Sequence, residues 1–212
     1  MEFDMKVLMI NGSSKKAGCT AAALAEAAGI LDKESIDVQT VHLGNGPVRD
    51  CIACGRCREL ENRCVFDDDM VNEILETADT ADGFVFGSPV YYAHPSGRIL
   101  SVLDRMFYAG KDLFVHKPGF AVVSARRAGT TASFDILNKY FTISEMPVVS
   151  SSYWIGVHGN TPDEVRQDRE GLQSVRHAAA NLAWLLKCIK AGKLAGINPP
   201  DNMKTEQTNF IR

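Results

Sequence analysis

The stretch KVLMINGSSKKAGCTAAALAEAAGIL (residues 6–31) contains the first strand, loop and helix of the chain, and it decides the fold class. It opens with a continuous apolar run, which is typical of a strand buried on both faces of a sheet. A loop of small polar residues follows, and residues 20–31 then carry alanine and leucine in a helical pattern. A buried strand that leads through a short polar loop into a helix predicts a parallel α/β sheet.

The same unit recurs along the chain. Strands are predicted at residues 6–11, 36–43, 83–89, 118–125 and 147–157, and helices at 20–31, 68–81, 96–108, 131–141 and 162–192. Five such units fit a doubly wound, five-stranded parallel sheet in the order 2-1-3-4-5, with helices on both faces. We expect one domain over residues 1–195 with a cysteine-rich insertion at 50–66. An extended tail at 196–212 is expected to pack on a neighbouring subunit.

Composition narrows the classes of partner. The chain has 212 residues, of which 45% are apolar and 23% charged, as in ordinary globular proteins. A formal net charge of -3 provides no attraction for nucleic acid or for an anionic membrane. No apolar run approaches the ~18 residues of a membrane-spanning helix. The first residues are interpreted as leading into a buried strand rather than as a signal peptide, so we expect a cytoplasmic protein.

The loop after the first strand has the composition of a phosphate site. In such sheets, ligands bind at the carboxyl ends of the strands, beside the first strand. The loop NGSSKKAGCT (11–20) contains neither a dinucleotide nor a nucleoside-triphosphate motif. It offers the hydroxyls of Ser13, Ser14 and Thr20, the flexible Gly18, and the N–H groups of a helix start, which suit a phosphate monoester. The alternative is a plain strand–helix turn with Thr20 as its N-cap.

Two further loops are expected at the same edge. GSPVYYAHPSG (87–97) carries Tyr91 and Tyr92, which suit the face of a flat aromatic ligand, although adjacent tyrosines also suit one core and one surface position. SARRAGTT (124–131) carries Arg126 and Arg127, which suit a phosphate-bearing co-substrate or a solvated charge patch. A phosphate cradle, an aromatic wall and cations together predict a site for flavin mononucleotide (FMN).

Four segments carry a family resemblance. KVLMINGSSKKAGCT, CIACGRCRELENRCVFDDDM, ADGFVFGSPVYYAHPSGRILSVLDRM and GFAVVSARRAGT together resemble the flavodoxin-like NAD(P)H-dependent FMN reductase family. The cysteine spacing is similar to that of its iron-sulfur flavoprotein branch. The resemblance covers about residues 5 to 155. It implies non-covalent FMN, NAD(P)H as co-substrate, a small-molecule electron acceptor, and a homodimer or homotetramer.

By this resemblance, three groups of residues contact FMN. Ser13, Ser14, Gly18, Cys19 and Thr20 would hold the phosphate; Pro89, Val90, Tyr91 and Tyr92 would border the ring; Ser124, Arg126 and Gly129 would close the other side. Cys19 stands where the family usually has asparagine, and a thiol is a poorer donor than an amide. We therefore expect a weaker phosphate contact there, or one made by the backbone alone. No catalytic acid or base is expected, because hydride transfer to flavin needs none.

The stretch CIACGRCRELENRC (51–64) places Cys51, Cys54, Cys57 and Cys64 within fourteen residues. The pattern begins like a bacterial ferredoxin ligand set, but its last gap is wider and no proline follows. Four thiolates at this spacing suit a 4Fe-4S cluster. Structural zinc usually draws two pairs of cysteines from separated knuckles, and disulfides are disfavoured in the cytosol. The sequence leaves three alternatives for this segment: a 4Fe-4S cluster, a zinc ion, or a loop without metal.

Three functions compete on these grounds. The first is an FMN-dependent oxidoreductase that passes electrons from NAD(P)H to a quinone, flavin, metal ion or nitro or azo compound. The second is an electron carrier in which a 4Fe-4S cluster receives electrons from ferredoxin and FMN passes them on. The third is a non-enzymatic module on the same scaffold, either redox-sensing or zinc-stabilised.

Overall fold

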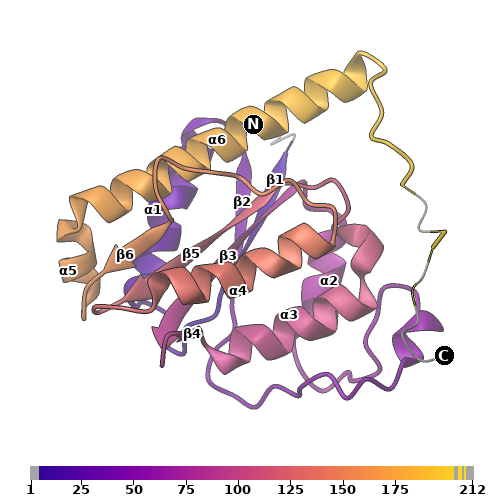
Figure 1. Cartoon of the computed structure of the whole chain (residues 1–212), viewed down its shortest axis with the longest axis horizontal. Coiled ribbons are helices and arrows are strands. Elements are labelled where there is room, and N and C mark those ends of the chain that lie inside the picture. Colours follow the sequence, from indigo (N-terminus) through magenta and orange to yellow (C-terminus); the bar gives the residue numbers. More distant parts are fainter. Residues whose placement is uncertain (1–4, 203–204, 207, 209–212) are drawn as a thin grey trace.

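A computed structural model describes residues 5–202, 205–206 and 208 of the chain. Its centre is a parallel sheet in the order β2-β1-β3-β5-β6 (Figure 1). The strands are β1 (Lys6–Asn11), β2 (Asp37–His42), β3 (Gly83–Tyr91), β5 (Gly119–Ala125) and β6 (Gly156–His158). Counted along the chain, this is the predicted order 2-1-3-4-5, so the doubly wound fold is confirmed.

Helices cover both faces of the sheet (Figure 1). On β1, the side chains of Val7 and Met9 join the apolar cluster on one face, and those of Leu8 and Ile10 join the cluster on the other. Successive strand residues point to opposite faces, and all four side chains are fully buried because helices cover both faces. The first face is covered by α1 (Cys19–Lys33), α5 (Pro162–Gln167) and α6 (Arg169–Leu194), and the second by α2 (Val71–Asp79), α3 (Gly97–Ala109) and α4 (Thr130–Ile143).

The predicted fifth strand, 147–157, is wrong over most of its length. Only Gly156–His158 pairs as a strand, and Val148 makes one isolated bridge to Gly119. The serines between them bond to α6 instead: the Ser151 hydroxyl donates to the Ser174 carbonyl at 2.6 Å, and Asn181 donates to the Ser150 carbonyl at 2.9 Å. The Asn181 side chain thus takes up a backbone carbonyl that a strand could have paired with β5, and the Ser151 hydroxyl fastens the segment to the backbone of α6.

The predicted long helix, 162–192, is also wrong, because it is two helices that meet at Asp168. The carboxylate of Asp168 accepts hydrogen bonds from the N–H of Gly171 at 2.9 Å and from the N–H of His158 at 2.7 Å. One side chain therefore caps α6 and ties it to the end of β6. An aspartate at such a position favours a new helix start over continuation of the preceding helix.

Shorter elements were not predicted. They are β4 (His94–Pro95), which pairs antiparallel with β3, and the 3-10 turns η1 (Arg56–Arg58) and η2 (Lys111–Leu113). The first residues of the tail lie on their own chain: the side chain of Asn202 donates to Glu145 at 2.8 Å. Residues 203–204, 207 and 209–212 of the predicted tail lie outside the described residues. Within the described part, no helix is long and apolar enough to cross a membrane.

Replacing Asp168 by alanine should remove the cap of α6 and the bond to β6. We expect the free energy of unfolding to fall by about 1–2 kcal/mol, measured by urea denaturation. The control is Asp163→Ala, which removes an exposed carboxylate from the first turn of α5. It should change stability by less than about 0.5 kcal/mol. Equal effects of the two substitutions would contradict this role of Asp168.

Candidate flavin site and cysteine cavity

Hydrogen bonds fasten the loops at the carboxyl ends of β1 and β3 to each other. The N–H of Gly12 donates to the carbonyl of Gly87 at 2.8 Å. The buried Ser96, which caps α3, donates its hydroxyl to the Gly12 carbonyl at 2.7 Å and its N–H to the Ser88 hydroxyl at 2.9 Å. The start of α3 therefore sets the spacing between the first two loops.

The loop after β1 leaves a helix start open for an anion. The helix α1 begins at Cys19 with Gly18 as its N-cap, and no side chain among the described residues caps it. The interpretation of Thr20 as N-cap is therefore wrong. Its hydroxyl instead shares a 2.8 Å hydrogen bond with that of Ser124 on β5. Free N–H groups in the first turn carry partial positive charge and suit a phosphate.

The other predicted phosphate residues divide by exposure. Ser13 is buried, and its hydroxyl accepts the N–H of Lys15 at 3.1 Å, whereas Ser14 is exposed. The thiol of Cys19 donates to the carbonyl of Gly159, with sulfur and oxygen 3.6 Å apart. The thiol is therefore turned toward the loop after β6, and Cys19 offers the loop after β1 its backbone N–H.

The second loop is a tight hairpin. β3 runs to Tyr91, turns at Tyr92 and Ala93, and returns as β4. Tyr92 and Ala93 have φ angles of 53° and 59°, a left-handed conformation that is uncommon for residues other than glycine. Pro89 and Val90 are half-buried, whereas both tyrosines are exposed. The alternative of one core and one surface tyrosine is therefore wrong.

Gly129 packs the third loop, which follows β5, against this hairpin. It has a φ of +91°, and a β-carbon on it would lie 2.6 Å from the Cα of Ala93. Only glycine allows this approach, because backbone atoms cannot move aside easily. The hairpin and the loop after β5 are thus held in contact. Arg126 and Arg127 are exposed at this loop, and Ser124 is buried beneath it.

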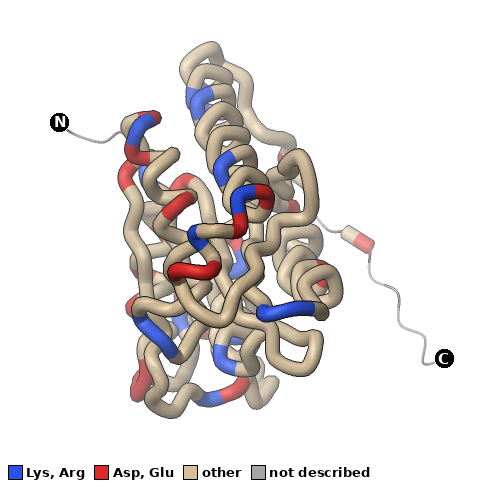
Figure 2. Tube along the Cα trace, turned by 90° about the vertical axis from the view of Figure 1, so that its left-hand side faces the viewer, with Lys and Arg blue, Asp and Glu red and all other residues tan. Residues whose placement is uncertain are grey.

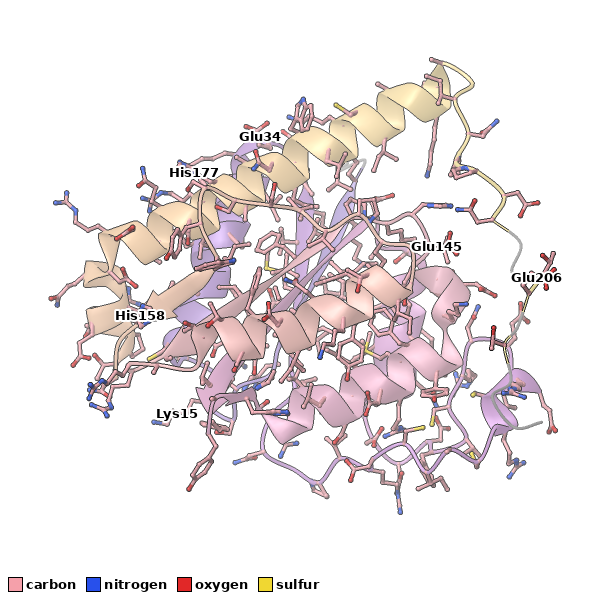
Figure 3. The ribbon with its side chains drawn as sticks, viewed as in Figure 1. Lys15, Glu34, Glu145, His158, His177 and Glu206 are labelled. Carbon is pink, nitrogen blue, oxygen red and sulfur yellow. The ribbon has the colours of Figure 1, made fainter. Side chains whose placement is uncertain are left out.

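The wider edge carries a cavity that sequence reasoning missed. Figure 3 shows Lys15 and His158 at this end of the molecule and Glu145 at the opposite end. A cavity of about 370 Å³ lies beside β6, with Thr130, Phe134 and Trp154 among its lining residues. Figure 2 faces this edge and shows basic and acidic residues interspersed. The adjacent aromatic residues Tyr153 and Trp154 were the available sequence signal; both are exposed, and their ring centroids lie 5.0 Å apart.

The four cysteines of the 51–64 motif line one cavity. Its volume is about 240 Å³, and Phe66, Arg105 and Tyr108 are among its other lining residues. Cys54 is exposed, the other three are half-buried, and all four are free thiols. Among the described residues, no three Cys, His, Asp or Glu side chains are arranged as a metal site. The four thiols that line this cavity are nevertheless a donor set that suits a metal centre.

Cys64 is the most firmly held of the four. The side-chain oxygen of the buried Asn72 accepts the N–H of Cys64 at 2.8 Å, and its amide donates to the Cys64 carbonyl at 3.1 Å. The guanidinium of Arg105 donates to the Cys64 sulfur at 3.3 Å. Neither Asn72 nor Arg105 was predicted. Their only sequence signal is a polar residue at a buried position of an amphipathic helix.

The family model of NADPH-dependent FMN reductases matches residues 5–161. The chain belongs to this family. This FMN reductase family member is also 31% identical over 194 residues to an iron-sulfur flavoprotein of Methanocaldococcus jannaschii, covering 88% of this chain and 100% of the relative. An iron-sulfur flavoprotein of Methanosarcina thermophila is 28% identical over 193 residues, covering 89% and 99%.

Solved structures at lower identity share the fold of this FMN reductase family member. A flavodoxin from the domain Archaea aligns with a TM-score of 0.58 at 14% identity, covering 86% of this chain and 99% of that one. RosB with a bound riboflavin-phosphate intermediate aligns with a TM-score of 0.63 at 15% identity, covering 98% and 92%. The family makes the chain a flavin-binding oxidoreductase that uses FMN and NAD(P)H. It lies in the iron-sulfur flavoprotein branch.

Replacing Gly129 by alanine should push the third loop away from the hairpin. We expect FMN to bind at least about tenfold more weakly, equivalent to about 1.4 kcal/mol, as measured by quenching of FMN fluorescence. The control is Gly44→Ala: Gly44 also has a positive φ of +67°, but a β-carbon there would meet no atom within 4 Å. It carries the same backbone strain and should leave FMN affinity unchanged. Equal affinities for the two variants would contradict the locking contact.

Proposed function

We propose that the protein transfers electrons from NAD(P)H through FMN to a small acceptor such as a quinone, flavin, metal ion or nitro or azo compound. The observation that carries this proposal is the set of three interlocked loops around the uncapped start of α1. In this proposal, residues 1–195 act as one FMN-binding domain. Bound FMN would supply the hydride chemistry, which the protein does not itself provide.

Each loop has its own task in the proposed site. The N–H groups of Cys19 and Thr20, with the exposed Ser14, would hold the FMN phosphate. The N–H of Gly18 instead donates to the Lys15 carbonyl at 3.2 Å, so Gly18 would shape the loop around the phosphate. The buried hydroxyls of Ser13, Thr20 and Ser124 support this loop from beneath. Pro89, Val90, Tyr91 and Tyr92 would border the ring, while Arg126 and Gly129 would close its other side.

Exposed cations at the same edge suit a co-substrate with phosphates. Lys15 and Lys16 follow β1, and Arg126 and Arg127 follow β5, and all four side chains are exposed. They would draw the pyrophosphate of NADH or NADPH toward the flavin by charge attraction. Such attraction weakens as salt is added, because exposed charges are screened over about 8–10 Å at moderate ionic strength.

We further propose that Cys51, Cys54, Cys57 and Cys64 hold a 4Fe-4S cluster. Two observations support it: four cysteines from one short segment line one cavity, whereas zinc usually takes two cysteine pairs from separated parts of the chain, and the similar proteins of Methanocaldococcus jannaschii and Methanosarcina thermophila are named iron-sulfur flavoproteins. A bound cluster would supply one-electron chemistry. The second candidate function, electron transfer from ferredoxin, is favoured by the exposure of Cys54 at this cavity. A homodimer or homotetramer stays a prediction.

Anaerobic purification should yield a coloured protein. We expect an absorption spectrum with the flavin bands and the broad shoulder of an iron-sulfur cluster, about four iron atoms per chain and little zinc. NADH or NADPH should then bleach the flavin band under anaerobic conditions. Reduction by reduced ferredoxin alone would favour the second candidate. A colourless, iron-free protein would refute both.

Replacing Cys64 by serine should abolish cluster binding while FMN stays bound. Serine oxygen is a poor ligand for iron in such clusters, and Cys64 is the sulfur that the protein holds most firmly. Iron content and the visible spectrum measure the loss. Cys188→Ser is the matched control, because Cys188 is an exposed free thiol on α6, outside the cavity. Full iron content in the Cys64 variant would contradict the assignment.

A further inference from the structure

Arg105 is a buried cation in the wall of the cysteine cavity. It lies on α3, its side chain is 1% exposed, and it lines the same cavity as the four thiols. A buried charge is costly unless hydrogen bonds and an opposite charge compensate it. The buried guanidinium of Arg105 therefore needs hydrogen-bond acceptors and an opposite charge, and the groups that provide them indicate what the side chain does.

The partners of Arg105 come from both ends of the cysteine segment. Its Nη1 forms an ion pair with the carboxylate of Asp69, whose side chain is 6% exposed. The guanidinium also donates to the carbonyls of Arg49 and Phe66, each at 3.3 Å. Its Nε donates to the sulfur of Cys64 at 3.3 Å. The Arg105 side chain thus joins the two ends of the cysteine segment, and its positive charge lies beside the sulfur of Cys64.

The charge on Arg105 is secure. Burial pulls the pKa of Arg105 down, but its hydrogen bonds to Asp69 and Cys64, and the attraction of those groups, hold the pKa above its ordinary value. Among the described residues, Cys64 is the one motif cysteine whose sulfur accepts a hydrogen bond from a cation. The thiol of Cys57 instead donates to the Tyr108 carbonyl, with sulfur and oxygen 3.5 Å apart. The four sulfurs are therefore not electrostatically equivalent.

We propose that Arg105 is a positioning residue that raises the reduction potential of the cluster through its Nε–H···Sγ bond to Cys64. The inference rests on the proposed function, because it requires the cluster at the four cysteines. Reduction adds negative charge to a cluster, and a cationic donor on a ligand sulfur stabilises that charge. Burial strengthens the effect, because little water screens it.

A matched control on the same helix distinguishes an electrostatic role of Arg105 from a purely structural one. Arg98 and Ser101 also fasten this segment to α3: Arg98 donates to the Gly46 carbonyl, and Ser101 donates to Asp50. Neither side chain bonds to a sulfur. Arg98, Ser101 and Arg105 follow one another at spacings of three and four, so they lie on one face of α3. An Arg98→Gln variant thus weakens the anchoring without changing the charge at Cys64.

The decisive experiment is a redox titration of the cluster followed by electron paramagnetic resonance. The double variant Arg105→Gln with Asp69→Asn removes the ion pair as a unit, so that neither charge stays buried alone. At a fixed applied potential, we expect at least a tenfold lower ratio of reduced to oxidised cluster, or about 59 mV for one electron. Arg98→Gln should not shift the ratio, and the FMN potential in the same samples should not move in either variant.

A second variant covers the case in which the double variant does not fold. Arg105→Lys keeps the charge and the partner Asp69 but lacks an Nε–H directed at the sulfur, so the ratio should fall in the same direction by a smaller factor. An unchanged ratio in a folded, iron-loaded Arg105 variant would overturn the inference, as would an equal fall in Arg98→Gln. If anaerobically purified wild-type protein contained no iron, the cluster itself would be refuted. That result differs from an iron-loaded Arg105 variant whose cluster potential is unchanged, which would refute only the role of Arg105.

Discussion

Burial of the central strands on both faces is the constraint on which the rest of this structure depends. β1, β3 and β5 are covered by helices on either side, so the side chains within them are almost all apolar. Polar groups with chemical uses can then gather only where the strands end. The phosphate loop, the tyrosine hairpin and the arginine loop all lie at the carboxyl edge for this reason.

The loops at this edge are held by short contacts between segments far apart in the chain. Thr20 reaches Ser124 through a hydrogen bond between hydroxyls, and Gly129 reaches Ala93 through close backbone packing. The strained turn at Tyr92 and Ala93 persists because this packing supports it. A rigid edge of this kind can bind a flat, phosphorylated ligand without first paying the entropy of ordering its loops.

Helix α3 serves both proposed cofactor sites. Its cap, Ser96, fastens the first two flavin loops, and Arg105, about 13 Å further along the helix axis, fastens the cysteine segment. On the same helix, Ile99, Val102, Leu103 and Met106 pack into the core. The same amphipathic helix therefore has one face that is needed for folding and another whose polar groups shape the cysteine cavity.

The sequence by itself determined the alternation of buried strands and helices and the close spacing of four thiols, because apolar periodicity and spacing are local properties. That alternation is typical of the doubly wound fold, whose strand order and carboxyl-edge loops could therefore be predicted. The sequence did not determine the break at Asp168, the loss of strand pairing at Ser150–Ser152, or the exposure of both tyrosines. Nor did it reveal that Asn72 and Arg105 converge on Cys64, since Arg105 and Cys64 are 41 residues apart. Apolar patterning encodes which face of an element is buried. Which polar groups meet across that face is decided only when the elements pack, because each buried donor must then find an acceptor within hydrogen-bonding distance.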